Sequence, residues 1–378
     1  MQPPQLDPDV PFLADVVPSV LAAMDVAGFD RHIELPGDLR AACVLLIDGL
    51  GDHLLAAHPR DAPVLSGLHR RSLQVGFPST TVASLAAVGT GCRAGAHGMV
   101  GYTFRHPDAG VVNPLRWRPQ PWGADLRDDL PPEQVQPLPT TFERATAAGL
   151  AVSIVSKAEF TGSGLTRAVL RGGRYVGVHG LGDLAASIGT VLTEGGFCYG
   201  YHGDLDLIGH LHGPGSVSWR MQLRQVDRLV ESIVESLPPG ALLAVVADHG
   251  MVQVTDDRTV DLDRSPALLD GVVAVAGEAR ARYVYVADGA ADAVLATWRD
   301  TLGDKAWVLT RDEAIAAGWF GDRIADEMRP RIGDIVAAAR DTAAMVRRST
   351  EPVESGLRGQ HGSLTPAEQL VPLLVAHA

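Results

Sequence analysis

The chain has little cysteine and no long apolar run. Its three cysteines, Cys43, Cys92 and Cys198, are odd in number and far apart, which argues against a disulfide framework or a CxxC zinc site. No segment approaches the roughly 20 consecutive apolar residues of a membrane span. The N-terminus lacks a basic segment, and Asp15 interrupts its apolar stretch, so a signal peptide is not expected. We predict a cytoplasmic protein that does not bind membranes and whose cysteines are reduced.

Positive charge is also scarce. The 378 residues include 32 lysines and arginines against 45 aspartates and glutamates, which gives a net charge of -13. Such an acidic chain is not expected to bind a nucleic-acid polymer, although a local metal site can still attract a phosphate ester. With 46% hydrophobic and 20% charged residues, the chain can bury a full core. This composition predicts one large domain and a smaller one.

Short apolar runs alternate with helical patterns along most of the chain. Four such runs, at 42–51, 151–157, 197–206 and 241–250, are apolar on both faces. Between the last two, apolar residues recur at steps of three and four from Trp219 to Leu237, a helical pattern that ends at Pro238. The sequence therefore predicts an α/β fold with a mostly parallel central sheet flanked by helices.

The pattern changes between about 256 and 350. This stretch contains one further strand-like run, at 281–288, among alanine-rich helical segments. Afterwards the chain returns to a motif of the first kind, "GQHGSLTPAEQLVPLLV". We predict that 256–350 forms a smaller inserted α+β cap domain, and that 1–255 and 351–378 form the catalytic domain.

Acidic and histidine residues follow the predicted strands of the larger domain. The set comprises Asp48, Asp206, His210, Asp248, His249 and, near the end of the chain, His361. Taken singly, Asp48 could form a turn, and Asp206 and His210 could lie in a solvated loop. Because ligands gather at the carboxyl ends of strands in open α/β sheets, we expect the six side chains to meet in one cleft. Three carboxylates and three imidazoles suit two borderline cations such as zinc.

The segment "FPSTTVASLAAVGTG", at 77–91, places two threonines before a run of small helix-forming residues. The free amide groups at the start of such a helix bind anions. One of the two hydroxyl groups could therefore meet a phosphate there, while its neighbour caps the helix.

In this order the motifs resemble those of the alkaline phosphatase superfamily, and most closely the nucleotide pyrophosphatase/phosphodiesterase family. The resemblance extends from "LLIDGLG" through "FPSTTVASLAAVGTG", "GAHGMVGY", "DLDLIGHLHGPGS" and "VVADHGM" to "QHG". It implies two zinc ions and a threonine nucleophile. The implied ligands of one ion are Asp206, His210 and His361, and those of the other are Asp48, Asp248 and His249 together with Thr81.

The resemblance also assigns individual roles near the nucleophile. The family's nucleophilic threonine is the fourth residue of a P-x-x-T stretch, and this stretch starts at Pro78, which favours Thr81 over Thr80. Three residues later the family usually carries an asparagine that holds a phosphate oxygen, and this chain has Ser84. A serine donates the same kind of hydrogen bond but reaches less far. We therefore expect Ser84 to bind the substrate.

The resemblance implies a two-metal hydrolase of phosphoric esters that forms a covalent phosphothreonine intermediate. Because the only cations near Thr81 in the sequence are Arg93 and Arg105, in loops, a singly charged phosphodiester or nucleotide pyrophosphate is expected over a monoester. The alternatives are a phosphomonoesterase, a phosphonate hydrolase, and a metal-dependent protein that binds a phosphorylated ligand without turnover. The partner in each case is a small phosphorylated molecule.

Overall fold

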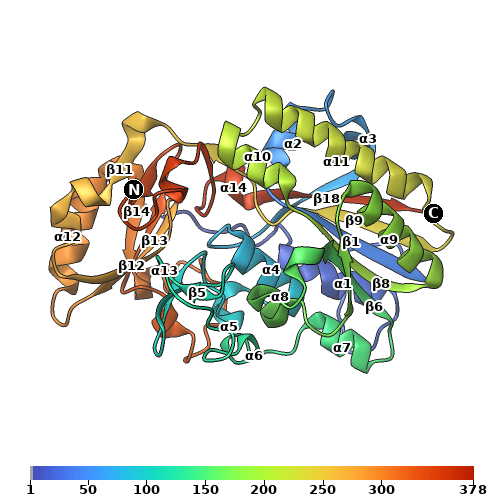
Figure 1. Cartoon of the computed structure of the whole chain (residues 1–378), viewed down its shortest axis with the longest axis horizontal. Helices are drawn as coiled ribbons and strands as arrows, with labels where there is room; N and C mark the ends of the chain where they lie inside the picture. The colour runs from blue at the N-terminus through green and yellow to red at the C-terminus, as the bar shows by residue number, and fades with distance from the viewer. Residues whose placement is uncertain (1–2) are drawn as a thin grey trace.

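The computed structural model describes residues 3–378, which form an elongated α/β molecule with a larger and a smaller sheet (Figure 1). The larger sheet has seven strands in the order β2-β18-β9-β1-β8-β6-β7. Their bounds are β2 (His69–Gln74), β18 (Leu370–His377), β9 (Ala241–Val246), β1 (Ala41–Ile47), β8 (Gly196–His202), β6 (Val152–Lys157) and β7 (Arg174–Val178). The five strands from β9 to β7 are parallel, and β18 runs antiparallel to both of its neighbours. The predicted mostly parallel central sheet is confirmed.

Burial on both faces explains the apolar runs of the central strands. All seven residues of β1 are buried, and β1 pairs in parallel with β8 and β9. Cys43 and Cys198 face each other across the β1–β8 ladder as buried thiols, and Cys92 is also free. Cys43 and Cys198 therefore belong to the packing of the core, whereas Cys92 is partly exposed.

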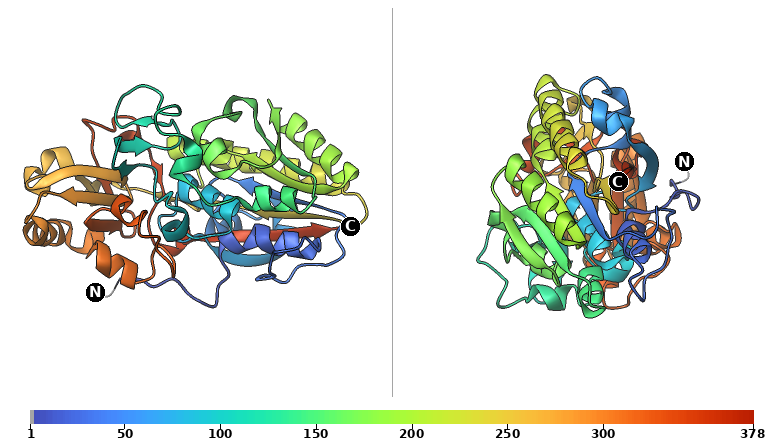
Figure 2. Two further views of the ribbon diagram at one scale, coloured as in Figure 1. Left: turned by 90° about the horizontal axis from the view of Figure 1, so that it is seen from below. Right: turned by 90° about the vertical axis from the view of Figure 1, so that its right-hand side faces the viewer.

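Helices cover the larger sheet on both faces, with α9 and α11 on one side and α1 and α4 on the other (Figure 2). The helices of this part are α1 (Val16–Ala23), α2 (Asp52–Ala57), α3 (Pro63–Gly67), α4 (Thr81–Thr90), α5 (Ala94–His97), α6 (Pro132–Val135), α7 (Thr141–Ala147), α8 (Gly164–Val169), α9 (Leu181–Glu194), α10 (Asp204–His212), α11 (Val217–Glu235) and α14 (Pro366–Gln369). α11 is the helix that the apolar spacing predicts. Its N-terminus is capped by the Ser216 side chain, which accepts a hydrogen bond from the Trp219 amide.

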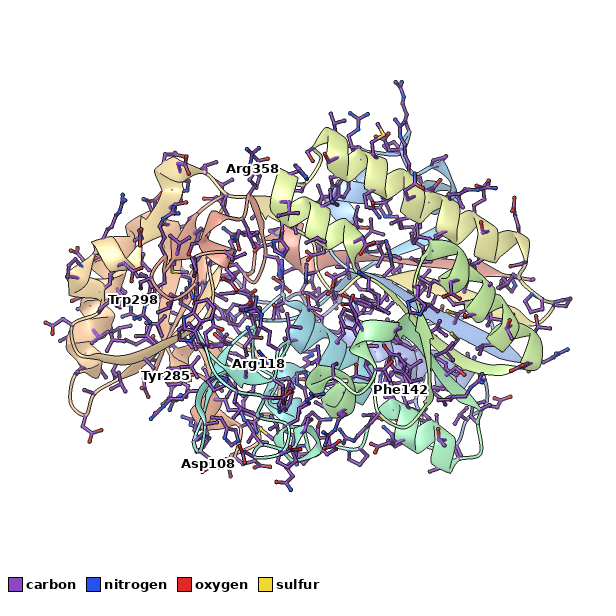
Figure 3. All side chains as sticks on the ribbon, viewed as in Figure 1. Asp108, Arg118, Phe142, Tyr285, Trp298 and Arg358 are labelled. Carbon is purple, nitrogen blue, oxygen red and sulfur yellow. The ribbon has the colours of Figure 1, made fainter. Side chains whose placement is uncertain are left out.

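The smaller sheet is antiparallel, in the order β12-β13-β15-β14. Its elements are β12 (Val272–Glu278), β13 (Ala281–Val286), β14 (Ala306–Thr310) and β15 (Ile335–Ala339), with α12 (Ala291–Leu302) and α13 (Arg311–Ala316). Buried Trp298 belongs to a core of its own here, whereas Phe142 belongs to the core of the larger sheet (Figure 3). The sequence identified β13 but missed the other three strands, because runs such as "IVAAA" also suit a helix. The boundaries 256 and 350 stay a prediction.

The remaining strands of residues 3–378 form three small sheets. They are β3 (Phe104–His106) with β4 (Gly110–Asn113) and β5 (Arg118–Pro119), β10 (Val252–Gln253) with β17 (Gly359–Gln360), and β11 (Thr259–Asp261) with β16 (Ala344–Val346). Across residues 3–378, no helix is both long and apolar enough to cross a lipid bilayer.

Two buried ion pairs connect the smaller sheet to segments that lead back to the larger one. Arg280, just before β13, lies 2.6 Å from Glu368 of α14, and Arg282 of β13 lies 2.6 Å from Glu351. Both arginines are fully buried and donate two hydrogen bonds to their carboxylate. Paired charges of this geometry can be buried only because each is satisfied by its partner. The β12–β13 hairpin is therefore held in one position against the C-terminal segment.

Candidate active site

Three adjacent strands bring the predicted ligands to one edge of the larger sheet. Asp48 follows β1, Asp248 follows β9, and α10 begins two residues after β8 ends. The Asp48 amide donates a hydrogen bond to the carbonyl of His202, which extends the pairing of β1 with β8 to the site. Because β9, β1 and β8 are neighbours and parallel, their carboxyl ends coincide, and residues distant in sequence become close.

Asp48, Asp248 and His249 form the first group. Each contributes a ligand atom within 4.8 Å of the others. His249 Nε2 lies 3.4 Å from Asp48 Oδ1 and 3.5 Å from Asp248 Oδ2. Asp248 Oδ1 accepts hydrogen bonds from the amides of Gly49 and His249, which fixes the carboxylate and leaves its second oxygen free. This arrangement brings together the three ligands that the resemblance assigned to one ion.

The resemblance assigned Asp206, His210 and His361 to the other ion, and in the structure Asp206 lies close to both histidines. Asp206 and His210 lie one turn apart on α10, so the solvated-loop interpretation of this motif is wrong. His210 Nε2 is 3.2 Å from Asp206 Oδ2, and His361 Nε2 is 4.0 Å from Asp206 Oδ1. The ligand atoms that lie within 4.8 Å of one another here are those of Asp206, His361 and His249. This group contains His249 where His210 was expected, so the assignment of His210 to this ion stays a prediction.

The donor atoms of these residues are arranged as metal ligands would be. Asp48 Oδ1, Asp206 Oδ1 and Asp248 Oδ2 are buried and have no hydrogen-bond partner among residues 3–378. The Nδ1 atom of each histidine lies within hydrogen-bond distance of a backbone carbonyl: Gly250 for His249, Gly359 for His210, and Ser79 for His361. Such carbonyl contacts fix the imidazole tautomer and direct Nε2 toward a metal. The residues therefore fit a divalent cation, which would satisfy the three bare oxygens.

The electrostatics of the metal-free site also favour a cation. Burial and the nearby charges of Asp248 and Asp206 raise the pKa of Asp48 well above its usual value. Burial and the positive charge of His249 lower the pKa of His361 well below its usual value. Burial opposes a charged His210, but the Asp206 carboxylate outweighs it and raises the pKa of His210 to about 9. Burial also raises the pKa of Asp248, and two carboxyl groups buried side by side such as Asp48 and Asp248 are stabilised in their charged form when a metal binds.

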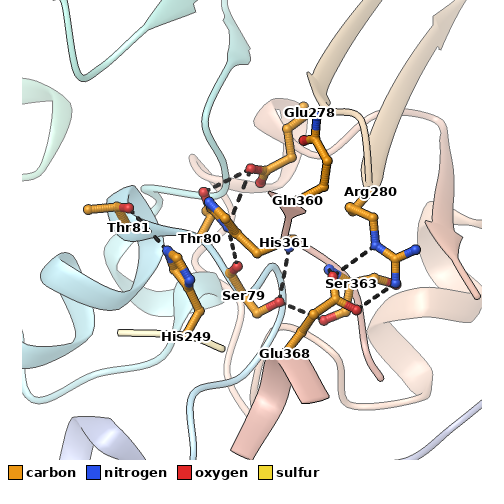
Figure 4. Close-up of polar contacts among 12 residues, drawn as sticks. Ser79, Thr80, Thr81, His249, Glu278, Arg280, Gln360, His361, Ser363 and Glu368 are labelled. Carbon is orange, nitrogen blue, oxygen red and sulfur yellow. Dashed lines mark hydrogen bonds and ion pairs between the residues drawn. The ribbon is translucent and has the colours of Figure 1, made fainter. Parts of the chain in front are cut away.

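Thr81 is the first residue of α4, and its Oγ1 atom lies 3.3 Å from His249 Nε2 (Figure 4). Thr80 occupies the N-cap position, but its side chain makes no capping hydrogen bond. Its hydroxyl instead donates to Glu278 Oε2 at 3.1 Å. The expectation that Thr80 caps the helix is therefore wrong: its hydroxyl donates to a carboxylate from β12 and accepts no hydrogen bond from the amides of α4.

Ser84 lies one turn further along α4 and is buried. Its Oγ atom donates a hydrogen bond of 2.6 Å to the backbone carbonyl of Asp248. The hydroxyl thus connects α4 to the loop that carries Asp248 and His249. Contact between Ser84 and a substrate stays a prediction.

The sequence interpretation missed two residues of the site. Tyr201 of β8 donates a 2.5 Å hydrogen bond to Asp48 Oδ2, and its position at the end of a strand could have suggested this. Glu278, at the end of β12, reaches the site from the smaller sheet, and burial raises its pKa to about 8. No local motif marks Glu278, since its role depends on how the two sheets are placed together.

Two cavities adjoin the site and share Thr81, Leu115 and Asp206 among their lining residues. One, of about 260 Å³, is largely apolar, with walls that include Leu85, Phe160, Leu165, Leu170 and Tyr201. The other, of about 390 Å³, lies toward His210, His361 and the smaller sheet. Thr81 is therefore placed at the junction of two spaces.

Comparison with known proteins agrees with the family resemblance of the sequence motifs. Residues 42–364 match the model of the family described as type I phosphodiesterase / nucleotide pyrophosphatase. A phosphopentomutase of Anaeromyxobacter dehalogenans (strain 2CP-C) is 30% identical over 149 residues, which cover 38% of this chain and 35% of that enzyme. The chain therefore matches about a third of that relative's length.

Solved structures show the same fold. Murine ectonucleotide pyrophosphatase/phosphodiesterase 5 superposes with a TM-score of 0.67 at 18% identity, covering 89% of this chain and 87% of that one. An inactive variant of that murine protein, in complex with AMP, superposes with a TM-score of 0.66 at 17% identity, with the same coverage of both chains. Phosphonoacetate hydrolase from Sinorhizobium meliloti 1021, in complex with phosphonoacetate, superposes with a TM-score of 0.67 at 20% identity, covering 90% of this chain and 91% of that one. The expected α/β architecture of this superfamily is thus confirmed.

Proposed function

The chain belongs to the type I phosphodiesterase / nucleotide pyrophosphatase family, and on this basis we propose that it hydrolyses phosphoric diesters at a two-metal site with Thr81 as nucleophile. The observation that carries the proposal is the set of three buried, unpartnered carboxylate oxygens beside Thr81. A protein without a metal would leave these oxygens desolvated and unsatisfied. The donor set of carboxylates and imidazoles favours zinc.

We propose that Asp48, Asp248 and His249 hold one ion next to Thr81. Asp206, His210 and His361 are proposed to hold the other. When bound, the metals supply Lewis-acid chemistry: they lower the pKa of a bound hydroxyl group and stabilise negative charge on phosphate and leaving-group oxygens.

The protein's own residues position the nucleophile and the phosphoryl group. Thr81 stands at the start of a ten-residue helix, whose first amide groups have no partner within the helix and can donate to phosphoryl oxygens. In the proposed reaction, the Thr81 hydroxyl loses its proton to solvent and Oγ1 bonds to phosphorus, while the ester oxygen leaves with the electrons of its bond and takes up a proton from water. Water then cleaves the phosphothreonine and restores Thr81.

Two features support a diester over a monoester. A diester has two ester groups, and two cavities meet at Thr81. A monoester carries an additional negative charge, yet Arg116 is the one arginine that lines either cavity within residues 3–378. Neither Arg93, which stacks over Phe12, nor Arg105, which lies near the ring of Tyr285, lines either of these two cavities. The site therefore suits a single charge.

The test is turnover by zinc-loaded protein of bis(p-nitrophenyl) phosphate, p-nitrophenyl phosphate and phosphonoacetate. We expect kcat/KM for the diester to exceed that for the monoester by at least about tenfold, or about 1.4 kcal/mol of transition-state binding. A ratio below one would assign the protein to the phosphomonoesterases. Efficient cleavage of phosphonoacetate alone would make it a phosphonate hydrolase, and no turnover of any compound would favour a ligand-binding protein.

A further inference from the structure

The larger of the two cavities contains one carboxyl group that has no cationic side chain paired with it among residues 3–378. Four acidic residues line this cavity: Asp206, Glu278, Glu351 and Glu354. Asp206 lies against His210, and Glu351 is paired with Arg282. Glu354 accepts a hydrogen bond from Tyr102 and lies 3.8 Å from Arg116. Glu278 has no lysine or arginine within ion-pair distance anywhere in residues 3–378.

The position of Glu278 is fixed by its neighbours. Its Oε2 atom accepts the hydrogen bond of Thr80 and lies 3.8 Å from His361 Nδ1 (Figure 4). Gly362 leaves the room that the carboxylate occupies, since a Cβ atom there would stand 2.9 Å from Glu278 Cδ. The Oε1 atom is buried and has no hydrogen-bond partner in the described part of the chain. One oxygen is therefore held in place, and the other is free to accept a hydrogen bond.

The mouth of the same cavity is apolar. Leu115, Leu207, Leu211 and Val353 line it, and each is an exposed large hydrophobic residue. They come from three separate segments: the β4–β5 connection, α10 and the loop before β17. Exposed apolar side chains that gather around a cleft mark a surface that contacts a ligand. The cavity thus has an apolar entrance and a hydrogen-bond acceptor near its catalytic end.

We propose that this cavity selects phosphodiesters in which one ester arm has an apolar carbon chain and a hydroxyl or ammonium group that donates to Glu278. The inference rests on the proposed phosphodiesterase function and names the substrate class of that site. Thr80 adjoins Thr81 in the chain, so the donor group must lie within a few bonds of the phosphorus. A donor that pairs with a buried acceptor gives strong discrimination, because a substrate without it leaves the acceptor desolvated and unpaired.

The experiment compares three p-nitrophenyl phosphodiesters whose second ester is propyl, 3-hydroxypropyl or 3-aminopropyl. Release of p-nitrophenolate by the zinc-loaded full chain is measured for each, after subtraction of the enzyme-free rate. We expect kcat/KM for at least one donor-bearing ester to exceed that for the propyl ester by about tenfold or more. The hydroxyl and amino compounds distinguish the two kinds of donor.

Variants connect the preference to Glu278. Glu278→Ala should bring the ratio of donor ester to propyl ester close to one. Glu278→Gln keeps an acceptor oxygen, so it should retain a preference for a hydroxyl group but lose one for an ammonium group. Glu354→Gln, on the same wall and already satisfied by Tyr102, is the matched control and should keep the wild-type ratio. Because each ratio is taken within one protein, a partial loss of folding does not change it.

The outcomes separate the two proposals. Equal kcat/KM for the three esters in wild-type protein, or a preference that survives Glu278→Ala, overturns the role of Glu278 and leaves the phosphodiesterase assignment intact. No hydrolysis of any of the three esters by zinc-loaded protein overturns the phosphodiesterase assignment, and the inference with it.

Discussion

His249 and His361 stack face to face, with ring centroids 3.5 Å apart and ring planes 13° from parallel. Two imidazolium ions at this distance would repel each other strongly, which disfavours a charged His361. Burial and the positive charge of His249 accordingly lower the pKa of His361 well below its usual value. Neutral imidazoles are the form that binds metals. This stacked pair places one histidine of each proposed metal site against the other.

We predict two metal ions per chain. Elemental analysis of purified protein should find about two, with zinc favoured. Asp206→Ala should mainly empty the site that includes His210 and His361, and Asp248→Ala the site that includes Asp48, because each change removes a charged ligand. Asp204→Ala is the control, since Asp204 lies on the same helix but pairs with Lys157. One metal or none in active protein contradicts the two-metal site.

Metal binding should release protons. Burial opposes the charge on His210, but Asp206 raises the pKa of His210 to about 9 in the metal-free protein, so the ring is charged at pH 7.5. A metal ligand must be neutral, and the proton leaves when the metal binds. The apparent zinc affinity should therefore weaken as pH falls below about 9. Titration calorimetry in buffers of different ionisation enthalpy measures this release, which His210→Ala should reduce; equal release in that variant contradicts the assignment.

The buried pair of Arg280 and Glu368 should contribute to both stability and metal binding. Arg280→Met leaves a buried carboxylate unpaired and should lower the free energy of unfolding by about 3–5 kcal/mol. Glu368 Oε1 also accepts a hydrogen bond from the amide of Ser363, two residues after His361, so zinc affinity should fall as well. Denaturant unfolding and zinc titration check both effects. Arg228→Met, which removes an exposed pair, should leave the unfolding midpoint unchanged, and a similar loss there would contradict the explanation.

Ser84→Ala should distinguish a structural role from substrate binding. Its hydroxyl donates to the carbonyl of Asp248, so the variant leaves a buried acceptor unpaired and should lose about 1–3 kcal/mol of stability. If this is the main role, zinc affinity falls and the KM for bis(p-nitrophenyl) phosphate stays close to that of wild type once zinc saturates the site. A large rise in KM at saturating zinc would instead support the expected contact between Ser84 and the substrate.

The parts of the site that the sequence predicted are those that depend on local pattern. Asp48 and Asp248 follow apolar strands, and the carboxyl ends of neighbouring parallel strands coincide, so their meeting could be expected from the strand pattern alone. The grouping of Asp206 with His210 follows from their spacing once α10 is known to be a helix.

The parts that could not be predicted depend on contacts between distant segments. Glu278 reaches Thr80 only because the β12–β13 hairpin of the smaller sheet is held by buried arginines. The strand β15 was missed because its alanines suit a helix equally well, and its pairing with β13 and β14 decided the outcome. The absence of the expected cap on α4 could not be predicted for the same reason, since the Thr80 hydroxyl donates its hydrogen bond to Glu278, a residue far along the chain.

The most direct test of the account is turnover of bis(p-nitrophenyl) phosphate by zinc-loaded wild type, Thr81→Ala and Thr80→Ala, with metal content measured in each protein. We expect wild type to be active and Thr81→Ala to retain most of its metal but lose turnover, because the attacking oxygen is gone. Thr80→Ala should keep substantial activity. An active Thr81→Ala protein together with an inactive Thr80→Ala protein would contradict the assignment of the nucleophile, and an inert wild type holding two zinc ions would contradict the proposed function itself.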